Sequence, residues 1–379
     1  MLFISDVDIS NKRVILRCDF NVPIENEKVM DNTKIKNSVK TIKYLLDNNN
    51  SVVLMSHLGR IKNKEDKEKY TLKPVITLLE ELLNKNIQFA SSPVGMKTLA
   101  KVKKLKKGEL LLIENTRYCD FPTELESKND IELSRYWSKF GDVFVVDAFG
   151  SLHRTHASVT GISDFLPTYF GFLVKEELDN LSLVTKNISH PFGIFMGGAK
   201  VDDKLKYIKN LLTRCDYLLV GGGIANSFLY ASGYDVGDSL KTESEEVLSE
   251  LKVLLNKYKE KIVLPIDFVI DNQKILDLNI KSIAKYLRYM RKCKTIFING
   301  TCGVFEDEKY AKGTKNFLEG IASINAIKIA GGGDAINAIN KFNLGHTFTF
   351  LSSGGGASLE YISSLSLEAI SYILSKKAK

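Results

Sequence analysis

Glycines and lysines at the end of one short apolar run are the first residues of this sequence that could do chemistry. The segment Ile194–Lys204 reads IFMGGAKVDDK, in which two glycines end the run and Lys200 and Lys204 follow. A strand that ends in glycines and leads into a helix leaves backbone N–H groups available to an anion, and nearby ammonium groups add positive charge. We predict a helix over 201–210, with the two lysines on one face near its start. A tight turn with two solvated lysines is the alternative interpretation.

Further glycine clusters follow apolar runs in the second half of the chain. They are Gly221–Gly223 after YLLV, Gly331–Gly333 after IKIA and Gly354–Gly356 after FTFLSS. The carboxyl ends of parallel strands meet at one edge of a sheet, and ligands of such sheets bind there. Glycines at the ends of successive strands therefore predict loops that hold the phosphates of a nucleotide.

Cationic side chains follow the apolar runs in the first half of the chain. The cations in these loops are Arg17, His57, Arg60, Arg117, His153 and Arg154. A single arginine on a loop is more often part of a surface ion pair, but several cations at strand ends favour a concave basic site for a small, multiply anionic substrate. His57, His153 and His156 could instead form a proton relay or a metal set; phosphate binding suits the first two better, and a packing role suits His156 equally well.

The elements that must position these residues alternate between strands and helices. Apolar runs such as 52–55 and 110–113 alternate with helical stretches at 36–47 and 71–83. This alternation predicts an α/β fold with parallel sheets and helices on both faces, a three-layer α/β/α arrangement. A chain of 379 residues favours two domains, and the pattern at 169–186 predicts a helix that bridges them.

Composition limits the class of protein. Hydrophobic residues make up 44% and charged residues 26%, which is typical of a globular chain, and the formal net charge of +8 comes from excess lysine. Basic residues without interleaved aromatics favour small anions over nucleic acid as partners. The five cysteines have no CxxC spacing or histidine partner, and no run reaches the ~18 apolar residues of a membrane helix. We expect a cytoplasmic protein with free thiols and no membrane partner.

Several common motifs are absent from the sequence. GxxxxGK[ST] does not occur, which excludes a P-loop enzyme, and GxSxG does not occur either. The lack of GxGxxG weakens a dehydrogenase hypothesis.

A series of motifs in order gives the chain from Val7 to Glu360 a resemblance to the phosphoglycerate kinase family. The motifs are RCDFNVP (17–23), SHLGR (56–60), ENTRY (114–118), DAFGSLHRTHAS (147–158), GGAKVDDK (197–204), GGGIANSFL (221–229), LPIDFV (264–269), NGTCGVFE (299–306), GGGD (331–334) and SSGGGASLE (352–360). The resemblance implies two Rossmann-like lobes that close about a hinge and transfer a phosphoryl group reversibly from 1,3-bisphosphoglycerate to ADP in glycolysis. It also implies Mg²⁺, ADP or ATP as co-substrate, 3-phosphoglycerate and ATP as products, and a monomer.

Motif position in this resemblance also implies the site residues. Binding of the phosphoglycerate is assigned to Arg17, Asp19, Asn21, Lys34, His57, Arg60, Arg117, His153 and Arg154. Binding of the nucleotide is assigned to Gly197, Gly198, Ala199, Lys200, Lys204, Gly221, Gly222, Asn299, Glu306, Gly332, Gly333, Asp334, Ala335 and Ser353, with Asp334 also the magnesium ligand. Lys34, Lys204, Gly333 and Gly356 are implied to be catalytic.

The same resemblance implies how the chain divides. Residues 1–167 would form the phosphoglycerate-binding lobe, 168–187 the hinge helix and 188–360 the nucleotide-binding lobe. Residues 361–379 would form a tail helix that packs back across the lobe boundary.

Three positions depart from the family pattern near the chemistry. Lys34 stands where the family has a catalytic arginine, Ala335 replaces a threonine and Thr301 replaces a proline. A lysine keeps the charge of an arginine but lacks its planar fork. The alternative hypothesis is therefore a catalytically weak homologue that binds a nucleotide or anion as an interaction protein. A dehydrogenase is a third hypothesis, testable by dinucleotide binding.

Overall fold

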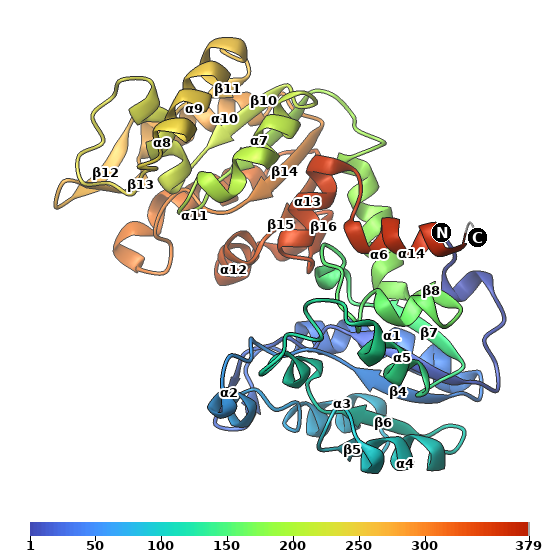
Figure 1. Cartoon of the computed structure of the whole chain (residues 1–379). Helices are drawn as coiled ribbons and strands as arrows, with labels where there is room; N and C mark the ends of the chain where they lie inside the picture. Colours follow the sequence, from blue (N-terminus) through green and yellow to red (C-terminus); the bar gives the residue numbers. More distant parts are fainter. Residues whose placement is uncertain (378–379) are drawn as a thin grey trace. The chain divides into compact units, whose positions relative to one another are not determined.

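The computed structural model of this chain describes residues 1–377, which form two compact units (Figure 1). Unit 1 comprises Met1–Leu178 and the residues from Ser366 onward, and unit 2 comprises Asp179–Leu365. The division falls inside helix α6 (Phe172–Leu181), within the segment 168–187 that the sequence predicts to join two lobes.

A parallel sheet forms the centre of unit 1, with strand order β5-β6-β4-β1-β7-β8 among the described residues. The strands are β1 (Arg13–Cys18), β4 (Ser51–Met55), β5 (Ile87–Ala90), β6 (Leu110–Ile113), β7 (Val143–Asp147) and β8 (Thr168–Phe170). The central strands are buried along nearly their whole length, as expected where helices cover both faces of a sheet. In register, Arg17 pairs with Met55 and Cys18 with Asp147, so the loops after β1, β4 and β7 start side by side.

Amphipathic helices pack against this sheet. They are α1 (Thr33–Asp47), α3 (Val75–Leu83), α4 (Met96–Lys104) and α5 (Ile131–Ser138). Unit 1 also contains a short α2 (Lys64–Lys69), a hairpin of β2 (Ile24–Glu25) and β3 (Lys28–Val29), and the C-terminal α14 (Glu368–Lys377). The apolar face of α1 places Ile35, Ile42 and Leu45 in one core cluster with β1. In α14 the N–H of Ala369 donates to the Leu152 carbonyl at 3.0 Å, which joins the C-terminal helix to unit 1.

Unit 2 contains a second parallel sheet, with strand order β11-β10-β9-β14-β15-β16 in the described chain. Its strands are β9 (Phe192–Met196), β10 (Tyr217–Val220), β11 (Ile262–Val263), β14 (Thr295–Asn299), β15 (Ile327–Gly331) and β16 (Phe350–Ser352). The helices are α7 (Leu205–Leu212), α8 (Gly222–Ala231), α9 (Glu245–Lys257), α10 (Ile280–Met290), α11 (Lys312–Ala322), α12 (Gly333–Lys341) and α13 (Gly356–Ser364). A hairpin of β12 (Phe268–Asp271) and β13 (Lys274–Leu278) lies outside the sheet. The predicted α/β fold with two parallel sheets is confirmed.

Some predicted element bounds are wrong. The helix expected over 71–83 begins only at Val75, because Pro74 disfavours the helical conformation of the residue before it. The stretch expected to be helical over 169–186 first completes β8 and then forms α6. Helix α13 continues to Ser364, past the predicted boundary at 360, and the tail helix starts at Glu368. Between residues 1 and 377, no helix has the length and apolarity needed to cross a membrane.

A buried carboxylate links the end of β7 to the start of α6. Asp147 has no exposed surface, and its Oδ1 accepts a hydrogen bond from the backbone N–H of Val174 at 3.2 Å. Residue 171 must be glycine, because a Cβ there would lie 2.3 Å from the Asp147 carboxyl carbon. Burial raises the pKa of Asp147 to about 7, and hydrogen bonds from Thr41 and the backbone of α6 offset part of that rise.

Replacing Asp147 by asparagine is expected to remove part of the pH dependence of stability. The folded-state pKa of this acid exceeds its ordinary value of 3.8, so its ionisation opposes folding and the wild type loses stability as the pH rises from about 4 to about 7. Relative to the wild type, the free energy of unfolding of D147N should therefore rise by roughly 3 kcal/mol between pH 4.5 and pH 7.5. Urea unfolding at both pH values measures this difference, with the exposed Asp8→Asn as control. If the difference in the free energy of unfolding between D147N and the wild type does not change with pH, the prediction is contradicted.

Candidate functional site

A basic cavity of about 750 Å³ lies in unit 1, beyond the carboxyl ends of its strands. It is lined by Arg60, Ile61, Lys62, Arg117, Asp120, Phe121, Pro122, Thr123, Glu124, Ser127, Lys128, Arg154 and His156. The structure thus brings together three of the predicted arginines from three separate loops. Burial and the positive charges of Arg117 and Arg60 lower the pKa of Arg154. Like charges held this close favour an anion between them.

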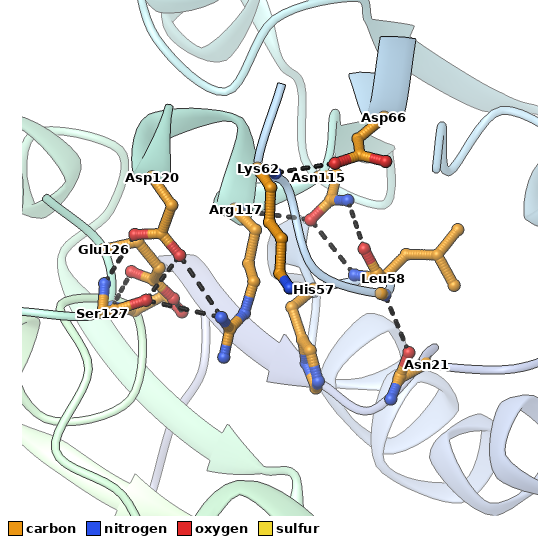
Figure 2. A network of polar contacts seen from close by, with 12 residues as sticks. Asn21, His57, Leu58, Lys62, Asp66, Asn115, Arg117, Asp120, Glu126 and Ser127 are labelled. Atoms are coloured by element: carbon orange, nitrogen blue, oxygen red, sulfur yellow. Dashed lines mark hydrogen bonds and ion pairs between the residues drawn. The ribbon is translucent and has the colours of Figure 1, made fainter. Parts of the chain in front are cut away.

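Arg117 is oriented by its neighbours on the short helix Thr116–Asp120 and on the loop that follows it (Figure 2). Its Nη1 lies 3.4 Å from Asp120 Oδ2 and 3.4 Å from Ser127 Oγ. Asp120 in turn accepts a hydrogen bond from the backbone N–H of Ser127 at 2.8 Å. The sequence analysis missed Asp120 and Ser127, since a carboxylate three residues after an arginine is common on any surface.

Asn115 joins two of the cationic loops. Its Oδ1 accepts hydrogen bonds from the N–H of Arg117 at 3.0 Å and from the N–H of Leu58 at 3.1 Å (Figure 2). Its Nδ2 donates to the carbonyls of Leu58 at 2.7 Å and Tyr70 at 2.9 Å. This buried amide therefore fixes the loop after β4, which carries His57 and Arg60, against the loop after β6. The only sign of this role in the sequence was the presence of an asparagine at the end of a strand.

Asp19, Asn21 and Lys34 lie outside the wall of the basic cavity. Lys34 Nζ forms an ion pair with Asp19 Oδ2 at 2.9 Å, and 30% of the lysine side chain is exposed. The Oδ1 of Asn21 accepts a hydrogen bond from the N–H of Gly59 at 3.0 Å. Asn21 and Gly59 line a second cavity, of about 380 Å³. Lys34 is thus held by a carboxylate rather than presented as an isolated charge.

Arg17 is buried, with 1% of its surface exposed, and it does not line the basic cavity. Its guanidinium contacts Ser158, the carbonyl of Cys18 and the ring of His57. This predicted ligand residue therefore contacts His57, which does not line the basic cavity either, and its nitrogens are used within the protein.

The three histidines of these loops carry little positive charge near neutral pH. Burial, followed by the charge of Arg17, lowers the pKa of His57 well below its ordinary value. Burial and the charge of Arg117 lower the pKa of His156 to about 3. His153 Nε2 accepts a hydrogen bond from Arg154 Nε at 2.8 Å, and burial lowers the pKa of His153 as well. Arginine and lysine, not histidine, therefore supply the charge of the cavity.

In unit 2, one set of glycines serves the packing of loops. A Cβ on Gly197 would lie 2.1 Å from the Thr301 carbonyl oxygen, and one on Gly223 would lie 2.0 Å from the Ala199 carbonyl oxygen. The N–H of Gly222, at the start of α8, donates to the Cys302 carbonyl at 2.9 Å. The cluster Gly221–Gly223 therefore lets three loops meet with their backbones in contact. Because the N–H of Gly222 is already used, the start of α8 offers an anion fewer free N–H groups than its sequence suggested.

A second set of glycines faces open space. Apart from its chain neighbours and the backbone of its own helix, a Cβ added to Gly333, Gly355 or Gly356 would have no protein atom within 4 Å. These glycines line a cavity of about 170 Å³ together with Lys204, Asn299, Gly300, Gly332, Asp334 and Leu359. Helices α12 and α13 both begin here, and the first-turn N–H groups of a helix lack intrahelical acceptors. A phosphate can therefore approach these backbone N–H groups closely.

Lys204 lies at this cavity, while Lys200 is exposed and lines neither of the unit 2 cavities. The start of the helix predicted over 201–210 is wrong, because residues Asp202–Lys204 form a 3₁₀ turn and α7 starts at Leu205. The two lysines are consequently not neighbours on one helix face. Lys204 Nζ donates to the Gly197 carbonyl and to Asn299 Oδ1, both at 2.8 Å. Burial lowers the pKa of Lys204, and the Asp334 carboxylate offsets part of this effect.

An adjoining cavity of about 270 Å³ has an apolar wall. It is lined by Gly198, Ala199, Gly222, Gly223, Asn226, Leu240, Lys274, Ile275, Leu276, Thr301, Gly303, Val304, Glu306 and Asp334. The apolar side chains suit a flat heterocycle, and the Glu306 carboxylate can accept hydrogen bonds from hydroxyl groups. Asp334 lines both cavities of unit 2. The sequence analysis missed Leu240 and the β13 residues, because they do not follow strands of the sheet.

Besides Gly197, Lys200 and Gly221, two further predicted nucleotide residues, Ala335 and Ser353, line neither of these cavities. Ala335 lies in the first turn of α12, and its side chain is buried in the core cluster with α10 and α11. Only its backbone therefore belongs to the helix start that faces the cavity. Ser353 is half-buried and lines neither cavity.

Known proteins resemble this chain over its whole length. Residues 4–364 match the family described as "Phosphoglycerate kinase". The chain is 40% identical to the phosphoglycerate kinase of Listeria innocua and 41% identical to that of Fusobacterium nucleatum, over 98% of this chain and 99% of each relative. The solved structures of the phosphoglycerate kinases of Coxiella burnetii and Pyrococcus horikoshii match with a TM-score of 0.86 each, at 32% and 29% identity, over 100% of both chains.

His57 and His156 are expected to titrate in the free protein with midpoints below the ordinary imidazole pKa of 6.5. Burial and nearby arginines lower the pKa of His57 well below this value and the pKa of His156 to about 3, so both rings are neutral at and above pH 7. Titration of the imidazole NMR resonances of ¹⁵N-labelled protein measures this, with N-acetylhistidine in the same sample as reference. A titration midpoint above pH 6 for either residue would refute the prediction.

Proposed function

Since the chain belongs to the phosphoglycerate kinase family, we propose that unit 1 holds the phosphoglycerate and unit 2 holds the nucleotide. The enzyme is a phosphotransferase with a carboxyl group as acceptor. It transfers a phosphoryl group reversibly from the acyl phosphate of 1,3-bisphosphoglycerate to ADP, giving 3-phosphoglycerate and ATP. The observation that carries the division of ligands is the contrast between the arginine-lined cavity of unit 1 and the open glycines of unit 2.

In unit 1, Arg60, Arg117 and Arg154 would bind the phosphate of 3-phosphoglycerate. Planar guanidinium groups bind phosphate oxygens in pairs, and these three already lie in one cavity wall. The neutral imidazole of His57 would donate a hydrogen bond to the same ligand.

In unit 2, the starts of α12 and α13 would hold the phosphates of the nucleotide through backbone N–H groups. Gly333, Gly355 and Gly356 leave room for that close approach. The base would lie against Leu240 and Val304, and Glu306 would accept the ribose hydroxyl groups.

Mg²⁺ fits this arrangement at Asp334. The carboxylate is exposed at the junction of the two cavities of unit 2, beside Lys204. Among the described residues, no group of three or more His, Cys, Asp and Glu side chains could hold a metal alone. Mg²⁺ is commonly bound by one or two carboxylates together with phosphate oxygens and water, and this donor set suits that mode. When bound, the ion would neutralise charge on the nucleotide phosphates.

Lys204 and Lys34 would stabilise the charge of the transferring phosphoryl group. Phosphoryl transfer needs positioning and electrostatic stabilisation more than covalent chemistry. The acceptors at Gly197 and Asn299 hold the Lys204 ammonium at the edge of the phosphate cavity. Lys34 supplies a point charge in place of a planar fork, and Asp19 orients it.

Because the two ligands are assigned to different units, transfer requires closure of the units and exclusion of water. We propose that α6 supplies the hinge. We also propose a monomer that works in a reducing cytoplasm, the setting that its free cysteines favour.

A second candidate function is binding of a nucleotide or anion with weak catalysis. Lys34 lacks the fork of an arginine, and the side chain of Ala335 offers the site no hydroxyl group. This candidate predicts binding without appreciable turnover.

Replacing Lys204 by alanine is expected to lower kcat by ~10²–10³ while ADP binding largely survives, because the ammonium acts on the transferring group. ATP formation from 1,3-bisphosphoglycerate and MgADP measures the rate, and calorimetry measures ADP binding. The exposed Lys206→Ala is the control. Wild-type protein that binds ADP but forms no ATP would favour the second candidate.

Replacing Gly356 by valine is expected to weaken ADP binding by about tenfold or more without loss of stability. A Cβ at this position meets no atom of the surrounding loops, and the added methyl groups would extend into the space assigned to phosphate. Gly356→Ala, with a smaller side chain, should have a smaller effect in the same calorimetric titration. Equal ADP affinity in the wild type and both variants would place the phosphates elsewhere.

A further inference from the structure

A carboxylate with no exposed surface lies close to the basic cavity, at Glu126. Both of its oxygens contact Ser158: Oε1 accepts from the hydroxyl group and Oε2 accepts from the backbone N–H at 2.9 Å. The Glu126 carbonyl also accepts from the N–H of Ala157 at 3.0 Å. Glu126 follows Asp120 on the loop that also contacts Arg117 (Figure 2). A buried carboxylate attached so firmly to one serine suggests that the serine serves another group.

That group is Arg17. Its Nε donates to Ser158 Oγ at 2.9 Å, while the Ser158 hydroxyl donates to Glu126. Its Nη1 donates to the Cys18 carbonyl, and its Nη2 lies 3.0 Å from Nδ1 of His57. The guanidinium is thus fixed at three nitrogens, with one hydroxyl group between it and the buried carboxylate.

The contact with His57 determines the state of that imidazole. A guanidinium has only donors, so Nδ1 of His57 must accept the hydrogen bond and the proton of the neutral ring must sit on Nε2. A doubly protonated ring would turn an N–H toward Arg17. The other titratable groups that act on His57 are Arg117, Lys34 and His156, which also oppose its protonation and so lower its pKa.

The charged form of Arg17 depends on Glu126 at this buried position. Burial disfavours its cation, Arg117 adds repulsion, and Glu126 is the largest favourable charge acting on it. Removal of one partner of a buried charge pair leaves the other uncompensated. Arg17 would then gain by turning toward solvent or an anion, and Nδ1 of His57 would lose its donor.

We propose that Glu126 is a positioning residue for the substrate cavity, which acts through Ser158 and Arg17 to hold His57 in its Nε2–H tautomer. The neutral imidazole then presents a fixed hydrogen-bond donor to 3-phosphoglycerate. This inference rests on the proposed function, in which His57 contacts that ligand.

The test uses Glu126→Gln, Ser158→Ala and Glu126→Asp in the full chain. Glutamine removes the charge, alanine breaks the relay but keeps the carboxylate, and aspartate keeps the charge on a shorter side chain. The imidazole ¹⁵N resonances of His57 report its tautomer in each protein. E126Q and S158A should show a mixture of tautomers where the wild type shows Nε2–H alone, and E126D should restore much of the wild-type signal.

Kinetics in the direction of 3-phosphoglycerate and ATP provide the second readout. The KM for 3-phosphoglycerate should rise about tenfold in E126Q and S158A, with the KM for ATP unchanged and kcat within about twofold. A merely structural role would change both KM values and kcat together and would leave the tautomer of His57 intact in S158A. The exposed Glu132→Gln is the matched control.

The outcomes separate the two proposals. An Nε2–H tautomer that survives in both E126Q and S158A overturns the inference, and S158A decides the matter alone if E126Q does not fold. If His57→Ala leaves the KM for 3-phosphoglycerate unchanged while E126Q alters the tautomer, the relay stands but the assigned substrate contact fails.

Discussion

The cationic side chains at the carboxyl end of the unit 1 sheet can lie close together only because carboxylates lie next to them. Arg117 lies against Asp120, Lys34 pairs with Asp19, and Arg17 faces Glu126 through Ser158. An arginine with 1% exposure would otherwise be a buried unpaired charge, which costs several kcal/mol. The carboxylates therefore let the cavity wall carry Arg60 and Arg154 close to Arg117 without unfolding the loops that hold them.

The cavities of unit 2 offer an anion a different set of groups. Its cavities contain few cations, and the open glycines at the starts of α12 and α13 offer backbone dipoles instead. Other glycines of the same motifs have no such role, because Gly197 and Gly223 are needed where loop backbones touch. One residue type thus serves two purposes within one edge of the sheet, packing on one side and ligand approach on the other.

The two routes suit the two ligands of a phosphoglycerate kinase. Arginines bind a small terminal phosphate through pairs of hydrogen bonds, whereas backbone amides and one magnesium carboxylate suit a chain of phosphates. At Lys204 a cationic side chain and helix starts lie together, since carbonyl and amide oxygens hold its ammonium beside those starts. Lys34 offers a point charge in place of a planar guanidinium group, and Asp19 pairs with it.

The sequence by itself determined the α/β fold, the two parallel sheets and the loops that carry chemistry, because strand periodicity, glycine position and motif order are local properties. Strand ends also pointed to Arg60, Arg117, Arg154 and Lys204, and motif order pointed to Asp334; each of these residues lines a cavity in the structure. Only the tertiary structure decided that Arg17 is buried against His57, that Lys200 and Lys204 are not neighbours on one helix face, and that Gly221–Gly223 serve packing. Burial and hydrogen-bond partners depend on segments far apart in the chain, as Arg17 and Ser158 are, and no local pattern records them.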